Sequence, residues 1–238
     1  MLLLAIPHPA YANVVFEKQR KAYTFQSLVM SDFMRTDQYL QETLSSLGYH
    51  LVSAVDLPMK RLAVRSGLAV YGRNNITYSE GMGSFLSLAA YFSDIPCESE
   101  DWSEIRLAKA CTNCQICTKN CPTGAIRKER FLIHNERCLS YLNESPGEFP
   151  AWLPETVHHT LYDCLRCQLK CPMNKDHVNQ VIEGIRFSEN ETQWLLSGCA
   201  YQYFPSALQE KADQLGLTDW LPAIPRNLKV LFKLSENN

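Results

Sequence analysis

The sequence predicts an α+β protein in which an α/β layer precedes a cysteine-rich module and a helical C-terminal region. Short apolar runs alternate with helix-periodic segments in the first third of the chain. Nine of the ten cysteines lie between residues 97 and 171. Helical patterns separated by prolines then continue to the end. We therefore expect three regions, residues 1–96, 97–175 and 176–238.

The first region begins with a strand, a helix and a second strand. Residues 2–6 form an apolar run that Pro7 ends, which indicates a short buried strand. An amphipathic helix is expected from about Asp32, with Gly48 as its C-cap glycine. Its apolar face is made of Phe33, Leu40, Leu44 and Leu47. The run at 51–55 predicts the second strand.

A turn and a second helix follow that strand. Asp56 and Pro58 lie in the turn, and the helix is expected over residues 59–66, ending at Gly67. Residues 76–78 predict another short strand, whereas the apolar run at 84–92 fits a strand or a helix. The C-terminal helices are expected at about 177–186, 190–198, 205–214 and 226–233.

Composition excludes several classes of protein. The chain has 238 residues, of which 46% are hydrophobic, so it can bury a core and is not disordered. The net charge of −2 gives no sign of a nucleic-acid or anionic-membrane partner. No apolar run approaches the roughly 18 residues of a membrane span. The apolar N-terminus is too short for a signal peptide, so a reducing cytoplasm is expected.

The cysteines repeat one spacing motif. The first copy is Cys111-x2-Cys114-x2-Cys117-x3-Cys121-Pro, and the second is Cys164-x2-Cys167-x3-Cys171-Pro. The first copy has the spacing of the bacterial ferredoxin run, in which the fourth cysteine binds the other cluster. The two-residue gaps let one tight loop place three thiolates around a 4Fe–4S cubane. The motif therefore predicts two clusters.

The second copy lacks one cysteine, and Cys138 makes up the number. Cluster one is then expected to use Cys111, Cys114, Cys117 and Cys171, and cluster two Cys121, Cys138, Cys164 and Cys167. A structural zinc site is the alternative, but zinc sites use paired CxxC knuckles rather than this triple run. Cys97 and Cys199 are left over and are expected to be ordinary buried thiols.

Segments on both sides of these cysteines resemble one family. They include GLAVYGRN at 67–74, GSF at 83–85 with DIP at 94–96, CPTGAI at 121–126 and RCLSYL at 137–142. In these segments the chain resembles the epoxyqueuosine reductases, relatives of the corrinoid-dependent reductive dehalogenases. The resemblance implies a nitroreductase-like α/β layer joined to a ferredoxin-like module. It also implies a base-off cobalamin beside the clusters.

The resemblance further implies roles for particular residues. Asp56 lies in a turn that matches the family's proton-donor turn, although it could instead cap the following helix. The cofactor pocket is expected to be lined by Thr77, Ser84, Leu88, Ser140 and Tyr141. Tyr141 could equally shield a cluster from water. The adjacent His158 and His159 point apart and are expected on the surface.

Two functions remain open at this point. The first is an iron–sulfur oxidoreductase that takes electrons from a ferredoxin or flavodoxin and passes them to a corrinoid, which reduces a small or nucleoside-like substrate. The second is a ferredoxin-like electron carrier without cobalamin. The family's helical-repeat region that holds tRNA is missing here, and the pI is about 6.3, so tRNA is not an expected partner.

Overall fold

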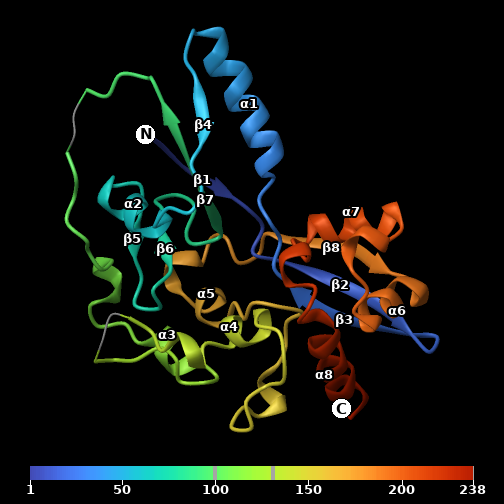
Figure 1. Cartoon of the computed structure of the whole chain (residues 1–238). Helices are drawn as coiled ribbons and strands as arrows, with labels where there is room; N and C mark the ends of the chain where they lie inside the picture. Colours follow the sequence, from blue (N-terminus) through green and yellow to red (C-terminus); the bar gives the residue numbers. More distant parts are fainter. Residues whose placement is uncertain (99–100, 130–131, 238) are drawn as a thin grey trace. The chain divides into compact units, whose positions relative to one another are not determined.

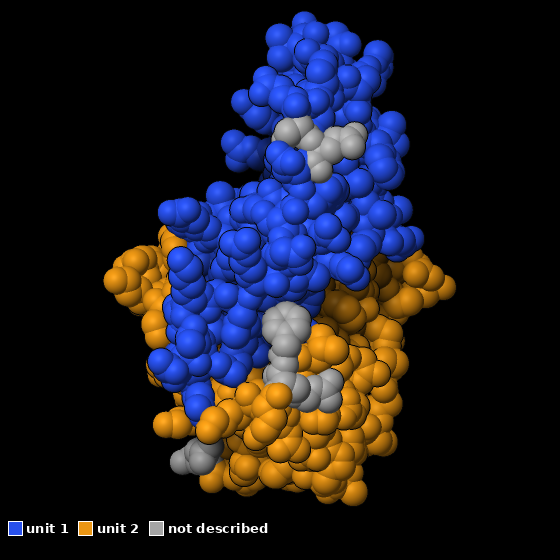
Figure 2. All heavy atoms as spheres, turned by 90° about the vertical axis from the view of Figure 1, so that its left-hand side faces the viewer, with its two compact units in different colours: residues 1–8, 31–115 blue, residues 9–30, 116–238 orange. Residues whose placement is uncertain are grey.

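The computed structural model describes residues 1–98, 101–129 and 132–237. It divides into two compact units, coloured separately in Figure 2. Unit 1 contains residues 1–8 and 31–115, and unit 2 contains residues 9–30 and 116–238. The predicted boundaries at 96 and 175 do not coincide with these units. The division into residues 1–96, 97–175 and 176–238 therefore stays a prediction, and it does not describe the two compact units.

Unit 1 is built on an antiparallel sheet with the strand order β1-β7-β4 (Figure 1). Its strands are β1 (Leu2–Pro7), β4 (Leu51–Ser53) and β7 (Leu86–Ser93). The central strand, β7, pairs Tyr91 with Leu2 on one side and with Ser53 on the other. The expected strands at 2–6 and 51–55 are confirmed, and the run at 84–92 is a strand rather than a helix.

Two α-helices and a small hairpin accompany this sheet in unit 1. The helices are α1 (Phe33–Ser46) and α2 (Met59–Arg65), and the hairpin joins β5 (Val70–Tyr71) to β6 (Thr77–Tyr78). Both helices end as predicted, because Gly48 and Gly67 have φ of +84° and +82° at the ends of α1 and α2. No residue of α1 is fully buried, whereas α2 buries Ala63 and Val64.

Unit 2 holds a second sheet, with the strand order β3-β2-β8. Its strands are β2 (Tyr11–Lys18), β3 (Lys21–Ser27) and β8 (Val181–Phe187). β2 pairs antiparallel with β3 and parallel with β8. The sequence pattern predicts no element over residues 10–30, and the prediction of a helix at about 177–186 is wrong. Residues 181–187 form a strand because they pair with the edge of β2 that β3 leaves free. Phe187 of β8 also stacks on Phe16 of β2, with ring centroids 4.8 Å apart.

The C-terminal helices pack on this sheet and share one apolar core with it. They are α6 (Glu189–Ser197), α7 (Ser206–Gln214) and α8 (Ile224–Glu236), close to the expected ranges (Figure 1). A capping box at Ser188 and Glu191 starts α6. Fully buried Leu208, Leu228 and Phe16 belong to one cluster that joins helices and sheet. No helix among the described residues is long and apolar enough to cross a membrane.

The cysteine-rich part of unit 2 consists of very short helices joined by turns. These are α3 (Ile116–Asn120), α4 (Leu139–Glu144) and α5 (Arg166–Leu169), with 3-10 turns η2 (Asn135–Arg137), η3 (Glu155–Val157) and η4 (Pro172–Asn174). α3 packs against α5. Such short elements have little stability of their own, so this region depends on tertiary contacts.

Candidate functional site

The eight predicted cluster cysteines are divided between the two units. Cys111 and Cys114 belong to unit 1. The other six belong to unit 2, where they lie at the ends of short helices and in the turns between them; they are Cys117, Cys121, Cys138, Cys164, Cys167 and Cys171. All eight are buried or half-buried. Cys97, by contrast, is exposed, so the expectation that it is buried is wrong.

Three of the four cysteines assigned to cluster two lie close together in unit 2. The charges of Cys121 and Cys138 both act on Cys164, and Cys121 also acts on Cys138. Burial raises the pKa of Cys164 to about 12 and also raises the pKa of Cys138. Thiols in such surroundings are deprotonated when a cation binds them and compensates their charge. This donor set therefore suits a cationic iron core.

Backbone amides point at these sulfur atoms. The Ala125 amide donates to Cys121 Sγ over 3.2 Å. The amides of Ser140 and Tyr141 donate to the Cys138 sulfur, and the amide of Arg166 donates to the Cys164 sulfur. Hydrogen bonds of this kind stabilise cysteinyl sulfur in iron–sulfur proteins. They fit the assignment of these three cysteines to one cluster.

Among the residues that the structure describes, no three His, Cys, Asp or Glu side chains are close enough to bind a single metal ion. The complete ligand sets therefore stay predictions from sequence spacing. What the structure adds is the proximity of Cys121, Cys138 and Cys164 and the amides that surround them.

A pair of carboxylates lies beside Cys138 and Cys164. The Ser140 hydroxyl is 3.0 Å from Glu144 Oε1 and 2.8 Å from Asp163 Oδ1. A hydroxyl has one hydrogen and cannot donate to two ionised carboxylates at once, so this geometry favours one protonated carboxyl. Glu144 is that group, because burial and the charge of Asp163 raise its pKa to about 7. The Ser140 hydroxyl was expected to line the cofactor pocket, but in the structure it is hydrogen-bonded to these two carboxyl groups.

We expect a Glu144→Gln variant to lose a pH dependence of stability that the unmodified protein shows. Glu144 keeps its proton to about pH 7 in the folded protein, against an ordinary pKa of 4.5. Between these values the folded state holds a proton that the unfolded state has lost, so the free energy of unfolding falls as pH rises. Between pH 4.5 and pH 8 the unmodified protein should lose about 3 kcal/mol of unfolding free energy that the variant does not lose. Urea unfolding at several pH values under anaerobic conditions measures this.

Glu148→Gln is the matched control, because this carboxylate lies on the same segment but is exposed. Its pH profile should match that of the unmodified protein. If Glu144→Gln and the unmodified protein gave parallel profiles between pH 4.5 and pH 8, Glu144 would not hold the proton.

Unit 1 contains a pocket that includes two of the predicted site residues. Its volume is about 550 Å³, and Asp56 and Leu88 both line it. The other lining residues come from α1, β4, the segment after β4, the start of α2 and β7, namely Phe33, Met34, Asp37, Ser53, Ala54, Val55, Met59, Ala89, Ala90 and Tyr91. The size suits a small organic molecule.

Asp56 does not cap the helix that follows it. The residue at the N-cap of α2 is Pro58, and no side chain caps that helix, so the capping alternative is wrong. Asp56 has φ of +57°, a left-handed conformation that is uncommon outside glycine but that aspartate adopts more readily than most residues. Its carboxylate has no hydrogen-bond partner among the described residues and is exposed. It is thus available to a molecule in the pocket.

The other predicted pocket residues lie in different surroundings. Thr77 and Ser84 are buried within unit 1, at 4% and 5% exposure. Tyr141 in unit 2 is 47% exposed. His158 was expected on the surface, but it is buried beside Phe149, bonds to Asn143 over 3.0 Å, and burial lowers its pKa to about 4. Buried polar partners, which no pattern in the sequence indicates, account for that difference.

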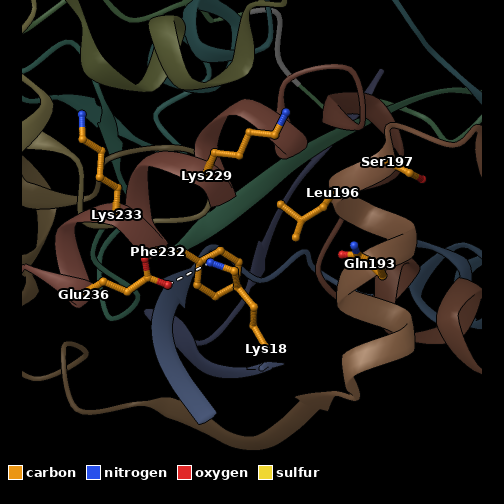
Figure 3. A pocket seen from close by; sticks show the side chains of 8 residues that line it. All are labelled: Lys18, Gln193, Leu196, Ser197, Lys229, Phe232, Lys233 and Glu236. Atoms are coloured by element: carbon orange, nitrogen blue, oxygen red, sulfur yellow. Dashed lines mark hydrogen bonds and ion pairs between the residues drawn. The ribbon is translucent and has the colours of Figure 1, made fainter. Parts of the chain in front are cut away.

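A second pocket, shown in Figure 3, lies in unit 2 between the end of β2 and the helices α6 and α8. Its volume is about 400 Å³. Lys18 reaches Glu236 over 2.8 Å and lies over the Phe232 ring, while Lys233 pairs with Glu155 over 2.6 Å. None of the residues predicted from the sequence lines this pocket.

Sequence reasoning did not identify Glu144, Asp163 or the contacts of Arg73. The Arg73 guanidinium donates to the carbonyl oxygens of Cys111 and Cys114, over 2.6 and 2.9 Å. The GRN segment stands out in the sequence as part of a motif, but nothing there indicates that its arginine reaches a loop about forty residues away.

Comparison with protein families gives one match. Residues 110–174 match the family described as a 4Fe-4S double cluster binding domain. This range contains all eight cysteines assigned to the clusters and neither Cys97 nor Cys199. The prediction of two 4Fe–4S clusters is supported, and the zinc alternative is not.

Curated relatives share more of the chain. The epoxyqueuosine reductase of Vibrio cholerae is 29% identical over 174 residues, which is 72% of this chain and 45% of the relative. That of Aliivibrio fischeri is 29% identical over 154 residues, 64% of this chain and 40% of the relative. The chain thus spans less than half the length of these relatives.

Solved structures agree on the fold. The epoxyqueuosine reductase of Bacillus subtilis, with a catalytic aspartate loop swung out of its active site, aligns with a TM-score of 0.66 at 21% identity. The alignment covers 97% of this chain and 63% of that one. A second epoxyqueuosine reductase, holding a stem loop of a tRNA, aligns with a TM-score of 0.60 at 22% identity. The mixed α/β fold is therefore shared with these enzymes.

Proposed function

Because the chain belongs to an epoxyqueuosine reductase-like family, we propose that it is an iron–sulfur oxidoreductase that moves electrons through two 4Fe–4S clusters to a corrinoid. The observation that carries the proposal is the double-cluster match over residues 110–174 together with the grouping of Cys121, Cys138 and Cys164 in unit 2. When bound, the clusters supply one-electron transfer and the corrinoid supplies a strong reductant.

The protein's own contribution to cluster two is binding and electrostatics. Cys121, Cys138, Cys164 and Cys167 would hold it, and the amides of Ala125, Ser140, Tyr141 and Arg166 would stabilise the sulfur ligands. Cluster one would be held by Cys111, Cys114, Cys117 and Cys171. The buried side chains around the cysteines keep water away, which lowers the reduction potential of an anionic cluster.

The pocket of unit 1 is proposed to bind the substrate, with Asp56 as its proton donor. Reduction of an electrophile such as an epoxide leaves a negative oxygen, and a carboxyl group in the pocket can protonate it. The support is the left-handed, unpartnered Asp56 at the pocket wall, and the catalytic aspartate loop of the Bacillus subtilis enzyme. Within unit 1, the corrinoid is proposed to contact a nitroreductase-like layer at Leu88, Thr77 and Ser84. The roles of Ser140 and Tyr141 in the ferredoxin-like module stay predictions from the resemblance.

The substrate class follows from the relatives. We propose a modified nucleoside of the epoxyqueuosine type. From the sequence, tRNA is not an expected partner, but the relative solved with a tRNA stem loop supports a nucleoside carried by tRNA. The electron donor is proposed to be a ferredoxin or flavodoxin of the cytoplasm.

Anaerobic reconstitution with iron and sulfide tests this function. About eight irons and eight sulfides per chain are expected from two cubanes, with EPR signals after reduction. Titration with hydroxocobalamin should then give the spectrum of a base-off corrinoid, and the loaded protein should reduce epoxyqueuosine as free nucleoside or in a tRNA stem loop. Stoichiometric zinc without iron would contradict the clusters. Two clusters with no cobalamin binding would favour the second candidate, a ferredoxin-like electron carrier.

A further inference from the structure

Within unit 1, the loop that carries Cys111 and Cys114 is tied to the turn between β5 and β6 by one side chain. Arg73, in that turn, donates from Nη2 to the carbonyl oxygen of Cys111 over 2.6 Å and to that of Thr112 over 3.3 Å. Its Nε donates to the carbonyl oxygen of Cys114 over 2.9 Å. One guanidinium thus binds three carbonyl groups within four residues of the cysteine loop.

These contacts determine which way the peptide groups of the loop face. In a trans peptide the C=O and the following N–H point in opposite directions. The carbonyls of Thr112 and Cys114 point at Arg73, so the amides of Asn113 and Gln115 point away from it. Within the described part of the chain, neither amide has a hydrogen-bond partner. A loop arranged in this way presents N–H groups on the side opposite the guanidinium.

That arrangement is what an iron–sulfur cluster requires of its binding loop. The cluster is anionic and accepts N–H donors, whereas carbonyl oxygens directed at it would repel it. The outward carbonyls need donors of their own, and a planar guanidinium with several N–H groups can serve three of them at once. Its positive charge also favours the more negative, reduced state of a nearby cluster.

We propose that Arg73 is a positioning residue for cluster one, which fixes the Cys111–Cys114 loop in its cluster-binding conformation and raises the reduction potential of that cluster. The inference rests on the proposed function, since it presupposes that the chain binds two clusters. It adds a residue outside the cysteine motif to the cluster site, and it links the fold of unit 1 directly to cluster binding.

The test compares three variants after anaerobic reconstitution. Arg73→Gln removes the charge and most of the donors, whereas Arg73→Lys keeps the charge and an N–H donor group. Lys60→Gln is the matched control, because Lys60 is a cation that donates to the Asn75 carbonyl of the same turn over 3.2 Å. Iron content and potentiometric EPR are measured on each.

We expect about four irons per chain in Arg73→Gln, against about eight in the unmodified protein, Arg73→Lys and Lys60→Gln. If Arg73→Gln keeps both clusters, one of them should titrate at a lower potential than in the unmodified protein, with recovery in Arg73→Lys. Full iron and unchanged potentials in Arg73→Gln would overturn the inference, as would equal losses in Arg73→Gln and Lys60→Gln. Failure of the unmodified protein to bind iron would instead contradict the proposed function.

Discussion

A Cys138→Ser variant is expected to hold about four irons per chain after anaerobic reconstitution, in place of about eight. Cys138 is the one assigned ligand outside the two motif copies, 17 residues after Cys121 and 26 before Cys164. Its sulfur accepts amide hydrogen bonds at the start of α4, next to the fully buried Leu139. Neither Cys121 nor Cys164 is expected to replace it, because both are themselves assigned to the same cluster.

The loss should also weaken the fold of unit 2. A cluster bound by Cys121, Cys138 and Cys164 closes the long loops between them, and closing such loops stabilises the folded state. Cys138→Ser should therefore unfold at a lower temperature than the unmodified protein. Cys199→Ser is the control, since Cys199 packs beside the apolar core of unit 2 and is assigned to neither cluster. Equal iron contents in the two variants would show that Cys138 is not a ligand.

An Asp56→Asn variant is expected to lose turnover by a factor of roughly 10²–10⁴ while it keeps both clusters. The amide preserves the shape of the side chain but cannot deliver a proton to the substrate. Iron content and cluster EPR should be unchanged, because the cysteines lie elsewhere in the chain. The measurement is the single-turnover rate of epoxyqueuosine reduction by the loaded, pre-reduced protein.

Asp94→Asn is the matched control for this variant. Asp94 is also an exposed carboxylate of unit 1, but it pairs with His50 over 2.9 Å and does not line the pocket. The Asp94→Asn variant should therefore have the same single-turnover rate as the unmodified protein. A comparable rate in Asp56→Asn and the unmodified protein would remove Asp56 from the reaction, even if both clusters and the corrinoid were confirmed.

The parts of the fold that could be predicted are those with strong local signals. Gly48 and Gly67 end helices because glycine adopts the left-handed conformation without strain, and this signal is visible in one sequence. The cysteine spacing is equally local, so the sequence alone is enough to predict the double-cluster domain.

The parts that could not be predicted depend on distant partners or on unusual turns. Gln19 and Arg20 turn the β2–β3 hairpin with φ of +52° and +62°, a conformation normally signalled by asparagine or glycine. Without that signal, the buried alternation of Ala12, Val14 and Phe16 did not lead to a predicted strand. β8 is a strand where a helix was expected, because its parallel partner lies about 170 residues earlier.

The pairing of β2 with β8 has a consequence for how the protein is made. A ribosome that adds roughly 5–20 residues per second releases β8 about 10–30 s after β2. During that interval one edge of the apolar strand β2 lacks its partner and is open to wrong pairing. The last assigned ligands, Cys164, Cys167 and Cys171, emerge in the same late stretch as β8. Iron delivery to the nascent chain and closure of its sheet therefore become possible at nearly the same moment.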